Sequence, residues 1–125
     1  MGQLVHRNLA EHLSIRVFKR PKKKDHLGLC VPYDQKKCRD FDIILYGSPK
    51  KRSYLKTLAH ECVHVGQFAT GERTDFKRYP NKVRFRDKEY QFDLVEYEDA
   101  PWELDALHKE VVLTQRFLKD NPEYL

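Results

Sequence analysis

The chain has 125 residues, of which 40% are hydrophobic and 34% charged, with a formal net charge of +5. This composition excludes a disordered chain and suits one modest core, so we predict a single domain over residues 1–125. Three cysteines argue against a disulfide-built secreted scaffold, and no apolar run approaches the roughly 18 residues that span a membrane. The N-terminus also lacks the apolar region of a signal peptide, so we expect a cytoplasmic protein.

Alternating apolar residues predict three strands in the first part of the chain. Weak helical spacing over residues 3–12 gives way to alternation over 13–18, and a second short strand is expected over 26–31. These two strands could pair with each other as a hairpin around the loop that joins them. Residues 41–46 have the best strand pattern in the chain, and Gly47 ends it.

The surplus of positive charge is concentrated in residues 19–24 and 50–52. A basic loop can be an electrostatic footprint for nucleic acid or another acidic partner, although charge of this size more often keeps a small domain soluble. No aromatic residue interleaves with the 19–24 run, as a single-strand stacking platform would require. A weak nucleic-acid contact through this loop is therefore one of the partners to test.

A helix is predicted from Ser48-Pro49, which resembles an N-cap followed by a proline at the first helical position, to about residue 70. Gly71 is its expected stop. The helix contains the run His60-Glu61-Cys62-Val63-His64. Residues four apart share a helix face, so both imidazoles can point at one place, and Glu61 lies about 100° further round. Two neutral imidazoles and a carboxylate base are what a catalytic zinc ion needs from one helix.

The residues around the motif put its histidines opposite the apolar face of the helix. With His60 as zero, the apolar positions cluster at roughly 140–260°, whereas His60 and His64 lie at about 0–40°. Histidines satisfied inside a core would lie on the apolar stripe, which leaves a solvated polar face as the ordinary alternative. Cys62 points toward the apolar stripe, so we expect it in the core and not at the metal. The motif predicts a zinc site.

The chain after Gly71 predicts a loop over 74–82, a hairpin on either side of Asp87-Lys88, and a last helix. Asp99 or Ala100 is expected to cap that helix. We predict that its apolar stripe consists of Leu104, Leu107, Val111 and Leu118.

A catalytic zinc site has three protein ligands, and the motif supplies two. The extended metzincin pattern is excluded, because Gln67 and Thr70 occupy the positions of its glycine and third histidine, and the chain's only methionine is Met1. The remaining choices for the third ligand are His108 or a carboxylate from the acidic run and the final helix. Acidic residues in a first helical turn also complement the helix dipole, so position alone does not identify the ligand. The candidate carboxylates are Glu96, Glu98, Asp99 and Glu103.

Residues 58–67 together with residues 101–106 resemble the small gluzincin-type zinc metallopeptidases. In that family the helix after the active-site helix supplies a glutamate in a Glu-x-x-Ala context. The resemblance covers about a third of the chain, and Trp102 stands where thermolysin-like members have asparagine. It implies Zn²⁺ as cofactor, Glu103 as the third ligand beside His60 and His64, and Glu61 as the general base. It also implies an α+β, minimal zincin-like fold: a small, mostly antiparallel sheet packed on an active-site helix and a C-terminal helix.

The expected function is therefore hydrolysis of peptide bonds by a zinc-activated water, with Glu61 taking up its proton. Tyr97 is our choice for a donor that stabilises the oxyanion, with Tyr90 and His108 as alternatives. In a cleft-type metallopeptidase an edge strand pairs with the substrate, and strand 41–46 is either that strand or an internal one.

We expect a monomer that acts on a peptide or protein substrate and does not contact membranes. The alternative function is a basic nucleic-acid- or protein-binding adaptor module with a structural or non-catalytic zinc site.

Overall fold

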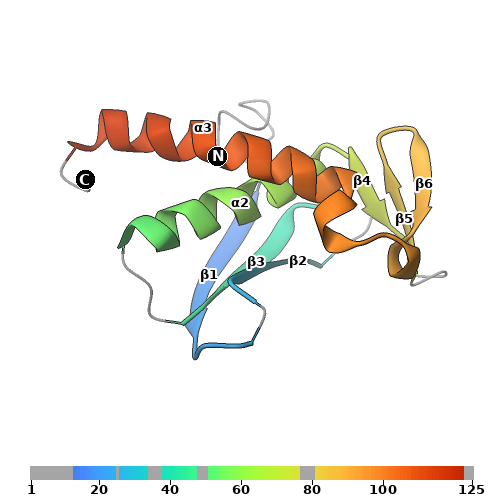
Figure 1. The fold of residues 1–125 in the computed structure, drawn as a ribbon, viewed down its shortest axis with the longest axis horizontal. Coiled ribbons are helices and arrows are strands. Elements are labelled where there is room, and N and C mark those ends of the chain that lie inside the picture. Colours follow the sequence, from blue (N-terminus) through green and yellow to red (C-terminus); the bar gives the residue numbers. More distant parts are fainter. Residues whose placement is uncertain (1–12, 25, 34–37, 48–50, 77–80, 123–125) are drawn as a thin grey trace.

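The computed structural model describes residues 13–24, 26–33, 38–47, 51–76 and 81–122. These residues form two three-stranded sheets and two long helices, which confirms the α+β class with mostly antiparallel strands (Figure 1). The helical spacing predicted for residues 3–12 and the helix start predicted at Ser48-Pro49 lie outside the described residues. In the part of the chain that is described, neither helix contains an apolar stretch long enough to cross a membrane.

The first sheet has β3 (Asp40–Tyr46) at its centre, between β1 (Ser14–Arg20) and β2 (Gly28–Pro32). β1 pairs with β3 in parallel and β2 pairs with it antiparallel. The predicted hairpin between the first two strands is therefore wrong, because each of them pairs with β3 instead. β3 alternates strictly between fully and partly buried residues, and a strand that buries one face so completely favours the centre of a sheet. Strand 41–46 is thus internal, and β2 is an edge strand.

The first core lies between this sheet and α2 (Lys51–Ala69). Phe41, Ile43 and Leu45 of β3 pack on one face of α2, and Cys62 packs against the same cluster, as its position on the helix predicts. Gly71 has a positive φ of 80°, the conformation that commonly ends a helix.

The second sheet consists of β4 (Arg73–Asp75), β5 (Lys82–Phe85) and β6 (Lys88–Gln91). The predicted hairpin is confirmed, since β5 and β6 pair on either side of Arg86 and Asp87. The predicted loop over 74–82 is wrong at its start, because β4 pairs antiparallel with β5. Two short 3-10 turns, η1 (Phe92–Leu94) and η2 (Tyr97–Asp99), then lead to the last helix.

The last helix, α3 (Pro101–Asp120), has Ala100 as its N-cap and runs alongside α2 in the opposite direction (Figure 1). Its predicted apolar stripe is largely wrong: Leu104, Leu107 and Val111 are 50%, 46% and 43% exposed, and only Leu118 is buried. The helix instead buries a partly polar face: Trp102, Glu103, Ala106, Glu110, Thr114 and Leu118. The reason is that α3 packs against the face of α2 that carries the histidines, so polar side chains meet polar side chains.

Trp102 anchors the start of α3 in a second core with Val83, Phe85 and Ala100. The guanidinium of Arg73 connects this core with the first one, since its Cζ lies 4.7 Å from the ring centroid of Phe68 and 5.1 Å from that of Trp102. The two cores are thus joined by one sandwiched cation, which Asp75 pairs at 2.9 Å.

Gly28 allows the edge strand β2 to approach α2 closely. A Cβ at this position would lie 2.7 Å from Thr57 Cγ2 and 3.2 Å from Glu61 Oε2, closer than ordinary van der Waals contact. The missing side chain therefore sets how near β2 comes to the motif helix.

We predict that Gly28→Ala lowers the free energy of unfolding by about 1–3 kcal/mol, the usual cost of overpacking. In a Thr57→Ser background the cost should be smaller, because the closest atom, the Cγ2 methyl, has been removed. Urea unfolding of the four proteins of this double-mutant cycle measures both values. An equal cost in the two backgrounds would contradict the proposed contact.

Candidate metal centre

Three side chains from two helices meet at the interface between α2 and α3. His60 and His64 come from the middle of α2, and Glu103 comes from the first turn of α3. All three are buried, and the histidines face α3 and not the first sheet. The prediction that the histidines lie off the apolar face of α2 is therefore confirmed.

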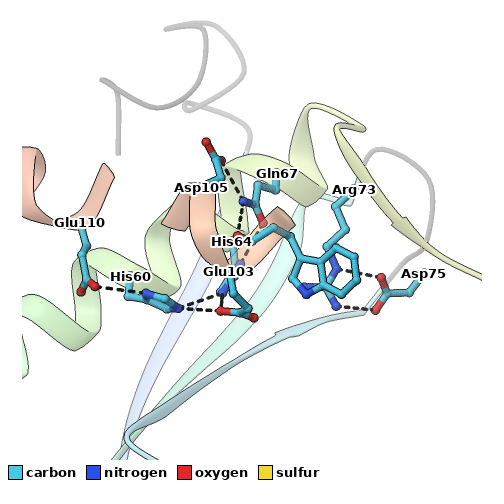
Figure 2. A network of polar contacts seen from close by, with 9 residues as sticks. His60, His64, Gln67, Arg73, Asp75, Glu103, Asp105 and Glu110 are labelled. Atoms are coloured by element: carbon cyan, nitrogen blue, oxygen red, sulfur yellow. Dashed lines mark hydrogen bonds and ion pairs between the residues drawn. The ribbon is translucent and has the colours of Figure 1, made fainter. Parts of the chain in front are cut away.

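The donor atoms of these residues are close enough to share one cation (Figure 2). Glu103 Oε1 lies 2.9 Å from His60 Nε2 and 3.0 Å from His64 Nε2, and the two Nε2 atoms are 3.2 Å apart. Ligands at 2.0–2.1 Å from a tetrahedral zinc ion are separated by about 3.3 Å, so the observed spacing is slightly tighter than a loaded site. Two imidazole nitrogens and a carboxylate oxygen form a group that could hold a metal ion.

The tautomer of His64 is set by Gln67, one turn further along α2. The Gln67 Nε2 group donates to the Trp102 carbonyl oxygen at 2.9 Å and to Asp105 Oδ2 at 3.0 Å. Because a carbonyl can only accept, the amide orientation is fixed and Gln67 Oε1 must face His64 Nδ1, at 2.9 Å. His64 therefore carries a proton on Nδ1, and in its neutral form the lone pair of Nε2 points at Glu103.

A carboxylate takes the corresponding position behind His60. Glu110 Oε1 lies 3.6 Å from His60 Nδ1, and Glu110 is buried two turns after Glu103 on the same face of α3 (Figure 2). Both histidines thus present Nε2 to the same point, His64 with a hydrogen-bond acceptor at Nδ1 and His60 with a carboxylate in ion-pair range of Nδ1. Partners of this kind fix the ring orientation and tautomer of metal-binding histidines.

The electrostatics of the centre favour a positive charge between these groups. Burial raises the pKa of Glu103, but the contacts with His60 and His64 lower it more, so the carboxyl is ionised far below its usual range. Burial lowers the pKa of His60, but its hydrogen bond to Glu103 and the charges of Glu61, Glu103 and Glu110 raise it overall. Neutral Nε2 lone pairs facing a carboxylate repel it, so a proton or a metal ion is needed to hold the three together.

Glu61 is buried beside the centre, and burial raises the pKa of its carboxyl above the ordinary value. Its side chain extends toward Gly28 of the edge strand β2. Within the described residues no group forms a hydrogen bond or ion pair with this carboxylate. A carboxylate that is both unpaired and raised in pKa is suited to accept a proton.

Tyr97 lies in η2, directly before α3, and is 64% exposed. Burial of its hydroxyl, the charge of Glu103 and a hydrogen bond to Glu103 all raise its pKa, so the hydroxyl keeps its proton. Tyr90 and His108 are the alternatives to Tyr97 as oxyanion donor. The ring centroid of Tyr90 lies 5.7 Å from that of Trp102, in the second core, and His108 is on the exposed side of α3.

The structure brings only one of the candidate third ligands to the histidines. Glu103 contacts both of them, whereas His108, Glu96, Glu98 and Asp99 are exposed and do not belong to the group around His60. Two supporting residues, Gln67 and Glu110, were missed from the sequence. The only available signal was the seven-residue spacing of Glu103 and Glu110, which places two acids on one helix face.

No protein family, no curated protein and no solved structure matches this chain. The chemistry of the centre therefore rests on its own residues.

We predict that the purified chain binds one zinc ion and that Glu103→Ala loses most of it, because two histidines alone leave the donor set incomplete. His108→Ala, a change on the exposed side of the same helix, should keep full occupancy. Metal content after dialysis, measured by plasma emission spectroscopy, compares the three proteins. Unchanged zinc in Glu103→Ala would remove this residue from the ligand set.

We further predict that Gln67→Met weakens zinc binding by about 10- to 100-fold, because His64 loses the acceptor that fixes its tautomer. Gln115→Met, on the exposed side of α3, is the matched control and should not change the affinity. Competition with a zinc chelator gives the dissociation constants, and nitrogen chemical shifts of His64 report the tautomer. A variant that retains wild-type affinity and shifts would contradict the role of Gln67.

Proposed function

We propose that this chain is a zinc-dependent peptidase in which His60, His64 and Glu103 hold the metal and Glu61 is the general base. The observation that carries the proposal is the fixed orientation of Gln67, which points the Nε2 lone pair of His64 at the Glu103 carboxylate, 3.0 Å away. Two groups that would otherwise repel each other are held together inside the protein. That arrangement suits a bound cation, and nitrogen and carboxylate donors in this number are typical of catalytic zinc.

A zinc ion bound here would supply Lewis acidity, which lowers the pKa of water and polarises a carbonyl group. The buried carboxylate of Glu61 then accepts a proton from the attacking water and donates it to the amine that leaves. The hydroxyl of Tyr97, which keeps its proton beside Glu103, is a donor for the carbonyl oxygen as negative charge develops on it. The amide bond is cleaved with consumption of one water.

The edge strand β2 is the element on which an extended substrate would lie. β3 already has partners on both sides, whereas only one side of β2 is paired within the first sheet. Gly28 of β2 is in contact range of Glu61, so a peptide paired along this edge passes beside the general base. The short distance between Gly28 and Glu61 also leaves little room there for a side chain of the substrate.

We predict that Glu61→Gln retains zinc but reduces cleavage of casein by at least about 100-fold, because the amide cannot accept the proton. Glu72→Gln, a change outside the centre, should cleave at the wild-type rate. Removing the metal with phenanthroline should abolish cleavage, and added zinc should restore it. The release of acid-soluble peptides over time measures each rate.

Undiminished casein cleavage by Glu61→Gln would overturn the assigned base. A wild-type protein that binds zinc firmly but releases no peptides from casein, and does not cleave itself, would overturn the peptidase proposal.

A further inference from the structure

A hollow of about 500 Å³ lies between the end of β1 and the first turns of α2. Its lining consists of Lys19, Arg20, Pro21, Lys22, Gly47 and Tyr54. We call this site the basic hollow, because every charged side chain in the lining is cationic. The Tyr54 hydroxyl donates to the Gly47 carbonyl oxygen, which ties the helix wall to the sheet wall.

Aromatic rings hold the cations of this region in place without neutralising them. Lys19 Nζ lies 5.1 Å from the ring centroid of Tyr54, and Lys23 Nζ lies 5.7 Å from that of Tyr46. The Arg20 guanidinium covers Phe18 in the same way, with Cζ 5.1 Å from the ring centroid. Cation–π contacts of this kind restrict the side chains and leave their full charge.

These cations lack acidic partners within the described residues. None of the five basic residues at the end of β1 and in the loop after it forms an ion pair there: Lys19, Arg20, Lys22, Lys23 and Lys24. Arg16, at the other end of β1, shows the contrast, since it pairs with Asp40 at 2.8 Å and with Asp42 at 2.7 Å. Arg73 likewise pairs with Asp75. The end of β1 and the loop after it thus form a run of basic residues without an acidic partner in the described part of the chain.

The start of α2 borders the basic hollow, and its first turn contains no acidic residue. Because the N-terminal end of a helix favours negative charge, an anion bound near this end would complement the helix dipole.

A short acidic segment lies away from the basic hollow. Exposed acidic residues occupy the segment between β6 and α3: Asp93, Glu96, Glu98 and Asp99. In Figure 1 this segment lies at the far right, whereas the loop after β1 is at the lower left. These acids are therefore too far away to neutralise the cations of the basic hollow.

We propose that the basic hollow binds the phosphates of single-stranded nucleic acid without reading its sequence. A single strand bends easily, so successive phosphates can follow a concave surface between a loop and a helix, which favours it over a stiff duplex or a flat membrane. The lining contains no asparagine, glutamine or acid that would recognise the edges of adenine or cytosine. The Arg20 guanidinium is held over Phe18, and the Lys19 ammonium group covers the ring of Tyr54, on which a base could stack. This site lies toward the start of α2, apart from His60 and His64, and does not depend on the proposed peptidase activity.

The test is fluorescence anisotropy of the full chain with a fluorescein-labelled 20-nucleotide oligothymidylate between 50 and 200 mM salt. The double variant Arg20→Ala with Lys22→Ala should raise the dissociation constant by about tenfold and lower the salt slope by about 1.4, roughly 0.7 for each phosphate that is no longer neutralised. The matched control, Arg84→Ala with Lys88→Ala, removes the same charges from the β5–β6 hairpin and should change the constant by less than about threefold. Lys22→Glu provides a second variant, with a single exposed side chain altered, and should weaken binding in the same direction.

An equal loss of affinity in the control would overturn the proposal, because it would show that only net charge matters. Polyglutamate or phosphatidylserine vesicles that compete as well as the oligonucleotide, at equal charge concentration, would assign the basic hollow to a different partner and overturn it as well. Retained zinc content and circular dichroism in the variants show that the fold is intact.

Discussion

The contact between Glu103 and the two histidines is the interaction around which the helices are arranged. It puts a carboxylate and two imidazoles inside the α2–α3 interface, where an apolar seam would normally lie. Burying these groups is costly unless they are paired, so Gln67 and Glu110 follow them into the interface. Because the polar face of α3 is the one that packs against α2, Leu104 and Leu107 are left half-exposed on its other side.

Local patterns were sufficient for most elements of the fold. The alternation of β3, the cap at Ala100 and the hairpin of β5 and β6 depend on neighbouring residues only, and these predictions are confirmed. The turn lies at Arg86 and Asp87, one residue before the predicted Asp87-Lys88. Strand pairing was not predictable in this way, because β1 and β2 are adjacent in sequence yet both prefer the more completely buried β3. The face of α3 was predicted wrongly for the same reason, since the partner of a helix decides which of its faces is buried.

The centre was predictable in part. The four-residue spacing of His60 and His64 and their position relative to the apolar stripe follow from helix geometry alone. Glu103 was reached through a resemblance, because no local rule separates a ligand from an acid that complements a helix dipole. Gln67 and Asp105 were out of reach, since their contact depends on how α3 crosses α2.

Trp102 has a consequence beyond the second core. Its ring is packed by Phe85 and Tyr90, its carbonyl oxygen is held by Gln67, and Arg73 lies across its face. The next residue in the chain is Glu103. The packing of the second sheet on Trp102 therefore fixes the first turn of α3 in place, and with it the backbone from which the Glu103 carboxylate extends. Residues of β5 and β6, which do not contact the centre, thus contribute to the position of one of its three donors.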